Sequence, residues 1–146
     1  MNTSGPGQLL FTFVRHWSRR APSGDALLPE QGRLMMTIEA VNSLIARNIP
    51  ASVNAIAREL GIDQSGASRL VKNAIDTQYL EMSRCAGDGR RREITVTTAG
   101  HAILDQAHAW QEKVFAELTA GWNQQRRSDF RDAMSDLMVR SDAIEA

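Results

Sequence analysis

The chain has little cysteine, few aromatic residues, no excess charge and no long apolar run. One cysteine among 146 residues, Cys85, excludes an intramolecular disulfide and fits a reducing compartment. No apolar stretch approaches the roughly 20 residues that a membrane-spanning helix needs. The first residues also lack the basic region that precedes the apolar part of a secretory signal. We therefore expect a cytoplasmic protein without a membrane segment.

The composition is that of a globular protein, with 42% apolar and 23% charged residues. Its length fits a single domain, 1–146. The net charge is +2 in residues 1–50, +1 in 51–97 and −3 in 98–146, so any attraction to nucleic acid has to come from a local patch. The sequence contains no catalytic nucleophile, phosphate-binding loop or metal cluster with convincing spacing. We therefore expect no enzyme, no cofactor and no metal.

Residues 52–76 have the pattern of two short helices joined by a tight turn. Ser52 can cap the first helix, Gly61 permits a left-handed backbone, Ile62 can fill the corner, and Asp63 can cap the second helix. This arrangement predicts a helix-turn-helix, although a generic helical hairpin can produce the same pattern. The apolar positions expected to be buried are Val53, Ile56, Ala57 and Leu60 in the first helix, and Ala67, Leu70, Val71, Ala74 and Ile75 in the second.

The remaining face of the second helix is rich in side chains that hydrogen-bond base edges and phosphates. Amide, hydroxyl and guanidinium groups predominate there, whereas a merely solvated helix more often carries Glu and Lys. A glycine on this face lets the backbone approach a groove wall closely. The residues are Gln64, Ser65, Gly66, Ser68, Arg69, Lys72, Asn73 and Asp76.

Two alternating runs, 79–84 and 93–97, flank a glycine-rich turn and predict a β-hairpin. Its tip carries Arg90, Arg91 and Arg92, and a wing of this kind can place arginine in a minor groove. Asp88 can pair with Arg90 and hold its guanidinium extended. A solvent-exposed hairpin tip is the alternative. With the helix-turn-helix, the hairpin predicts a mainly α fold with a winged helix at 29–97.

Apolar residues at helical spacing predict further helices on both sides of this module. We expect them at 8–20, from Pro29 to about 47, from Thr97 or Thr98 to about 120, and from Asn123 onward. The first and the last two have little domain to cover, so a second copy of the chain is the expected partner of segments 1–24 and 98–146. The residues expected to face inward are Leu9, Leu10, Phe13, Val14 and Trp17; Leu34, Met35, Ile38, Val41, Leu44 and Ile45; Ile103, Ala107, Trp110, Val114 and Leu118; and Phe130, Met134, Leu137, Met138 and Ile144.

The sequence resembles the MarR family of bacterial transcriptional regulators. The resemblance rests on the wing pattern from Asp88 through Arg90, Ile94, Val96 and Thr97 to Gly100, and on the segments 60–65 and 68–71. It implies a homodimer on a pseudo-palindromic double-stranded operator, with Ser65, Ser68 and Arg69 in the major groove, and Arg90, braced by Asp88, in the minor groove. Gly66, where a threonine-like residue is more usual, and the third arginine of the wing depart from the family pattern.

The resemblance also implies release from DNA by a small effector, commonly phenolic or otherwise aromatic. His16, Trp17, Arg20 and Met36 are candidates to line its site, and each can equally be a core or surface residue. Cys85 can report oxidation by forming a mixed disulfide. His101 and His108 lie on about the same helix face and, with Asp105, are a weak zinc signal.

The sequence thus predicts a sequence-specific transcriptional regulator, a repressor released by its effector. The alternative is a winged-helix module whose partner is another protein. An enzyme is the third class considered and has no motif in its favour.

Overall fold

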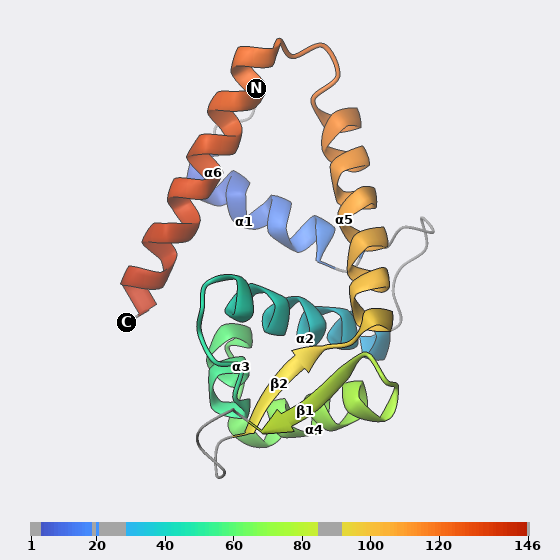
Figure 1. Cartoon of the computed structure of the whole chain (residues 1–146). Helices are drawn as coiled ribbons and strands as arrows, with labels where there is room; N and C mark the ends of the chain where they lie inside the picture. The colour runs from blue at the N-terminus through green and yellow to red at the C-terminus, as the bar shows by residue number, and fades with distance from the viewer. Residues whose placement is uncertain (1–3, 19, 21–28, 85–91, 146) are drawn as a thin grey trace. The chain divides into compact units, whose positions relative to one another are not determined.

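The computed structural model describes residues 4–18, 20, 29–84 and 92–145 (Figure 1). In this part of the chain, helices dominate and one antiparallel pair of strands completes a winged helix, which confirms the predicted mainly α fold. No helix among the described residues is both long and apolar enough to cross a membrane. The elements are α1 (Pro6–Trp17), α2 (Pro29–Ala46), α3 (Val53–Leu60), α4 (Gln64–Asp76), β1 (Leu80–Arg84), β2 (Arg92–Val96), α5 (Thr98–Leu118) and α6 (Gln124–Glu145).

The chain divides into two compact units, Met1–His108 and Ala109–Ala146. The boundary lies inside α5, whereas the sequence placed the end of the winged module at residue 97. That 1–146 acts as a single domain stays a prediction.

The helix-turn-helix forms where the sequence predicts it, because its ends are marked by local chemistry. The Ser52 hydroxyl accepts a hydrogen bond from the Ala55 amide at 3.1 Å and caps α3. Gly61 ends α3 in the left-handed region, with φ 68° and ψ 34°. Two details are corrected. Asp63 occupies the N-cap position of α4 without a side-chain capping bond, and Ile62 is 39% exposed because it lies on the surface of the turn instead of filling the corner.

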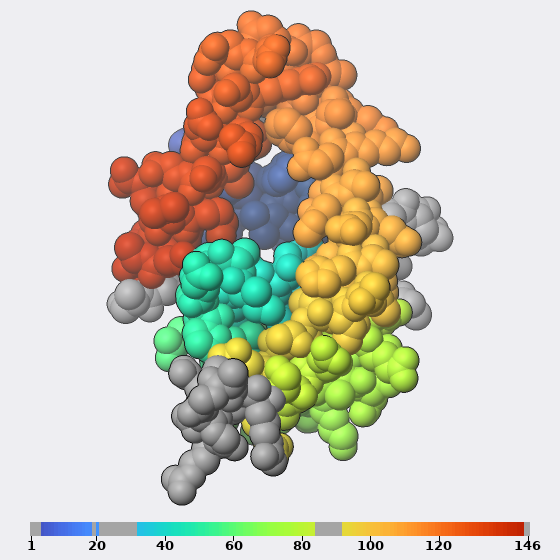
Figure 2. Space-filling model, viewed as in Figure 1, coloured from blue at the N-terminus to red at the C-terminus, as the bar shows by residue number. Residues whose placement is uncertain are grey.

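The strands β1 and β2 pair antiparallel, with Leu80 opposite Val96. Alternation along the strands puts Leu80 and Ile94 on the buried face of the hairpin. The Ile94 amide also donates a hydrogen bond to the Ala51 carbonyl at 2.9 Å, which fixes the hairpin to the segment before α3. In Figure 2, the atoms of α2 and β2 meet without an opening.

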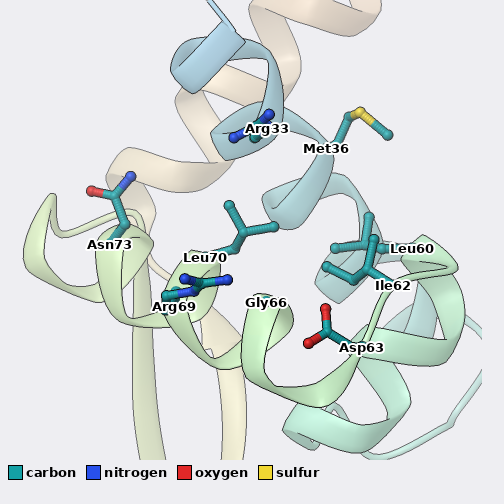
Figure 3. Close-up of a pocket in the computed structure, with 9 residues that line it drawn as sticks. All are labelled: Arg33, Met36, Leu60, Ile62, Asp63, Gly66, Arg69, Leu70 and Asn73. Carbon is teal, nitrogen blue, oxygen red and sulfur yellow. The ribbon is translucent and has the colours of Figure 1, made fainter.

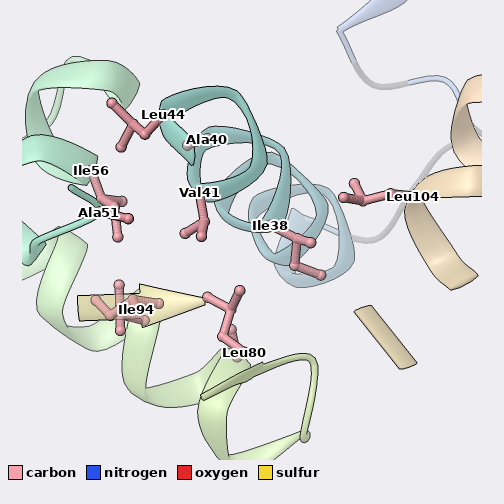
Figure 4. Close-up of a cluster of buried hydrophobic side chains, with 11 residues drawn as sticks. Ile38, Ala40, Val41, Leu44, Ala51, Ile56, Leu80, Ile94 and Leu104 are labelled. Carbon is pink, nitrogen blue, oxygen red and sulfur yellow. The ribbon is translucent and has the colours of Figure 1, made fainter. Parts of the chain in front are cut away.

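The core of the first unit is formed around α2 (Figure 4). Ile38 and Val41 of α2 are fully buried, and Leu80 and Ile94 of the hairpin are each 1% exposed. Removing a side chain of this size from water contributes about 1.5–3 kcal/mol. The buried cluster comprises Ile38, Ala40, Val41, Leu44, Ala51, Ile56, Val71, Ala74, Leu80, Ile94 and Leu104.

Along α2 and α5, the observed burial differs at single positions from the burial expected from the sequence. Ile45, expected inside, is 44% exposed, because α2 is covered mainly on the side of Ile38 and Val41. In α5 the buried side chains are Leu104 and Ala107, while Leu118 is 49% exposed. The spacing identified the helix correctly but did not show which of its turns are covered.

The start of α5 is joined tightly to the start of the hairpin. The Thr97 hydroxyl accepts a hydrogen bond from the Gly100 amide at 3.0 Å and donates one to the Gln78 carbonyl at 2.7 Å. The Thr97 amide donates to the Tyr79 carbonyl at 3.1 Å. A Cβ on Gly100 would overlap the Tyr79 carbonyl oxygen and lie 2.7 Å from Val96 Cγ1. Gly100 is therefore required by close backbone packing.

The second unit is a helical hairpin formed by the end of α5 and by α6. Gly121 follows α5 with a positive φ of 87°, and the Asn123 side-chain oxygen caps α6 by accepting a hydrogen bond from the Arg126 amide at 2.8 Å. Phe115 of α5 stacks on Phe130 of α6, with ring centroids 5.7 Å apart. These contacts hold the two helices of this unit together.

Candidate nucleic-acid interface

The helix α4 buries an apolar face and exposes a polar one, because its apolar residues recur three and four positions apart. Ala67, Val71 and Ala74 are buried, and Leu70 and Ile75 are half-buried. The side chains predicted to contact DNA are left on the outside. All of those on this helix are exposed: Gln64, Ser65, Ser68, Arg69 and Lys72.

Four of these side chains line one shallow hollow on the exposed face of α4. They are Gln64, Ser65, Ser68 and Arg69. The hollow combines an amide, two hydroxyls and a guanidinium, which between them donate and accept hydrogen bonds, and no carboxylate is among its described lining. Such a surface suits base edges and phosphate oxygens. Lys72 is exposed on the same helix but does not line this hollow.

Of the four charged residues predicted to act at the tip of the wing, Asp88 and Arg90 to Arg92, only Arg92 lies in the described part of the chain. It is exposed, begins β2, and lies opposite Arg84 in the register. Asp88, Arg90 and Arg91 fall in the segment 85–91, which lies outside the described residues. Their contacts with each other and with DNA stay predictions.

A second hollow lies between α2, the turn after α3, and α4 (Figure 3). One end is polar, with Arg33, Arg69 and Asn73, and the other is lined by apolar side chains and Asp63. Arg69 lines both hollows, so the two are adjacent. Arg33 was missed by the sequence reasoning, since nothing local marks an arginine of α2 as a neighbour of α4. The lining residues are Arg33, Met36, Leu60, Ile62, Asp63, Gly66, Arg69, Leu70 and Asn73.

Three of the four candidate effector residues lie together at the end of α1. The rings of His16 and Trp17 meet edge to face with centroids 5.1 Å apart. The Arg20 guanidinium donates a hydrogen bond to the His16 carbonyl and lies 6.0 Å from the centroid of the Trp17 ring. Met36 is 54% exposed and lines the second hollow, whose described lining includes none of the other three.

The alternative sites receive no support from the geometry. His108 Nε2 lies 2.8 Å from Glu39 Oε1 of α2, so this ring contacts a neighbouring helix. Within the described ranges, no group of three or more His, Cys, Asp or Glu side chains is placed to hold a metal ion, which removes the basis for a zinc site at His101, Asp105 and His108. Cys85 lies outside the described residues, so its redox chemistry stays a prediction.

The arrangement of α2, α3, α4 and the hairpin defines a winged helix-turn-helix module. Residues 43–91 match the model of the MarR family. Comparison with curated protein sequences gives no match.

Solved structures of MarR-type regulators have a similar fold. MepR of S. aureus, in a structure bound to ethidium bromide, is 15% identical with a TM-score of 0.61, over 96% of this chain and 99% of that one. Wild-type MarR from E. coli in its apo form is 14% identical with a TM-score of 0.68, over 94% and 98%. The transcriptional regulator Tm0710 from Thermotoga maritima is 15% identical with a TM-score of 0.60, over 94% and 95%.

These findings confirm the predicted resemblance. The matched residues 43–91 cover α3, α4 and β1, and the fold is similar to that of the solved MarR-type regulators. Proteins of that family are transcriptional regulators and not enzymes.

Proposed function

We propose that this protein is a sequence-specific DNA-binding transcriptional repressor that acts as a homodimer on a pseudo-palindromic operator. The observation that carries the proposal is the hollow formed by Gln64, Ser65, Ser68 and Arg69 on the exposed face of α4. The major groove of B-DNA, about 12 Å wide, admits an α-helix and presents a distinct donor and acceptor pattern for each base pair. The side chains of the hollow have the chemistry to read that pattern.

The cationic side chains supply the second part of the interface. In the proposal, Lys72 contacts a phosphate at the edge of the groove, and the wing carries Arg90 to Arg92 toward the neighbouring minor groove. Asp88 then orients Arg90 before DNA binds. Phosphate contacts fix the position of the module, whereas the base contacts of α4 supply its sequence preference.

Dimerisation is supported by apolar side chains that the single chain leaves exposed on its first and last helices. α1 has no buried residue, and Phe11 of α1 is 71% exposed. On α6, Met138 and Val139 are 61% and 68% exposed. A second copy covers these faces in the proposed homodimer and sets two recognition helices against two half-sites. The exposed apolar residues of these two helices are Leu9, Phe11, Phe13, Val14, Phe130, Leu137, Met138, Val139 and Ile144.

Release by a small aromatic effector is the regulatory part of the proposal. His16, Trp17 and Arg20 offer ring faces and a guanidinium at one place, which suits an aromatic molecule. Met36 offers an exposed, adaptable apolar side chain. A repressor of this kind acts on the bacterial chromosome, so the proposal includes a cytoplasmic location.

Selection of bound duplexes from a random library, by the purified protein at stated salt concentration, tests the proposal. We expect enrichment of an inverted repeat whose half-site centres lie about one helical turn, roughly 34–36 Å, apart. Placing the enriched duplex between a promoter and a reporter then tests repression. Expression of the protein should lower the reporter signal, and an active aromatic compound should restore it.

Failure of a folded dimer to enrich any duplex would reject operator reading. The module would then be assigned to protein recognition, the alternative that the sequence left open. In that case, replacing Arg90 should leave partner binding almost unchanged.

A further inference from the structure

The hollow between α2 and α4 is lined by two cationic side chains, Arg33 and Arg69 (Figure 3). Arg33 comes from α2, and Arg69 and Asn73 come from α4. In the described part of the chain, neither arginine forms an ion pair. Two guanidinium groups that share a hollow repel each other unless an anion lies close by. Asp63 also lines the hollow but forms no ion pair with either arginine in the described part of the chain.

The polar end of this hollow lies next to the exposed face of α4 that we propose to contact DNA. Arg69 lines both hollows, so the polar end begins where the base-reading face stops. Gly66, Leu70 and Asn73, at intervals of four and three, lie along the side of α4 that borders α2. When a helix lies in the major groove, its sides face the two rows of phosphates that border the groove. The side next to α2 then faces one of these rows.

We propose that the Arg33 guanidinium binds a backbone phosphate of the DNA, with the Asn73 amide as a neighbouring donor. This assignment rests on the proposed function and extends the interface from α4 to α2. The planar fork of N–H groups on arginine matches the oxygens of a phosphodiester. Arg33 therefore orients α4 in the groove without reading sequence.

The test compares Arg33→Gln with the wild-type protein on the selected duplex and on a random duplex over a series of salt concentrations. We expect affinity to fall about two- to fivefold on both duplexes, the loss typical of an exposed charged contact. The slope of log affinity against log salt should decrease by about 0.9 for each bound protomer, because one phosphate contact is lost. Arg33→Lys keeps the charge and should retain most of the slope.

A matched control removes the same charge elsewhere. Arg131 of α6 is 87% exposed, so Arg131→Gln should leave the salt slope at its wild-type value. Thermal melting followed by circular dichroism establishes that each variant is folded at the assay temperature.

The outcomes separate this assignment from the function on which it rests. A wild-type protein that binds no duplex would overturn the proposed function and this contact together. Normal wild-type binding with an unchanged slope in Arg33→Gln would overturn only the contact. A loss confined to the selected duplex would make Arg33 a reader of base edges and overturn its assignment to a phosphate.

Discussion

Replacing Gly100 with alanine should destabilise the protein, although alanine is the better helix former. Gly100 is the third residue of α5, where a Cβ would overlap the Tyr79 carbonyl oxygen. That oxygen cannot rotate away, since it belongs to the backbone and accepts the Thr97 amide bond at 3.1 Å. Relief of the overlap requires α5 to move away from the base of the hairpin. The capping bond of Thr97 would be strained by the same movement.

The expected change in the free energy of unfolding is the sum of two opposing contributions. Overpacking of this kind destabilises by about 3 kcal/mol, and exchanging glycine for alanine in a helix stabilises by about 1 kcal/mol. The net loss of about 2 kcal/mol should lower Tm by roughly 4–8 °C for a chain of this length.

Gly66→Ala is the matched control, because Gly66 is the third residue of α4. A Cβ there would lie 2.8 Å from Asp63 Oδ1, the end of a side chain that can rotate away and makes no capping bond. We therefore expect Gly66→Ala to raise stability by about 0.5 kcal/mol, part of the difference in helix propensity. The two variants should shift Tm in opposite directions.

The assay is thermal unfolding followed at 222 nm, at equal protein concentrations, with denaturant unfolding as a second measure. A Gly100→Ala variant that melts at or above the wild-type temperature would refute the close packing of α5 on the hairpin.

Three further predictions concern the cap, the reading face and the dimer. Ser52→Ala should cost about 1 kcal/mol of unfolding free energy in denaturant titrations, because α3 loses its N-cap; no loss would mean that the hydroxyl is not needed there. Arg69→Ala should reduce discrimination between operator and random DNA by about 1–3 kcal/mol in binding assays, whereas equal losses on both would indicate a phosphate contact. Leu137→Glu should shift the protein toward monomer in sedimentation at unchanged helix content, since it puts a charge on the exposed apolar face of α6; an intact dimer would place the interface elsewhere.

The helix-turn-helix could be predicted because its signals are local. A hydroxyl at Ser52 and a glycine at position 61 specify a cap and a left-handed turn whatever surrounds them. The polar face of α4 followed in the same way from helical spacing. Four of its predicted residues, including Ser65 and Arg69, do share one hollow.

What could not be predicted depends on packing between distant segments. Arg33 lines one hollow with Asn73 only because α2 packs beside α4, and nothing near Arg33 in the sequence indicates this. Burial along α5 has the same cause: Leu104 reaches the core and Leu118 does not, although both lie on one amphipathic helix. The reason for Gly100 is likewise tertiary, since its close neighbour Tyr79 lies before the hairpin.

The register of the hairpin has a consequence for how this protein can vary. Leu80 and Ile94 fix the pairing from the buried side, and the Ala51 carbonyl secures Ile94. A slip by one residue would turn these side chains outward, so the strands themselves tolerate little change. The positions that can vary are the outward-facing ones, such as Glu81 and Ser83, which are exposed. New side chains can be tried there, one variant after another, while the scaffold that presents them stays the same.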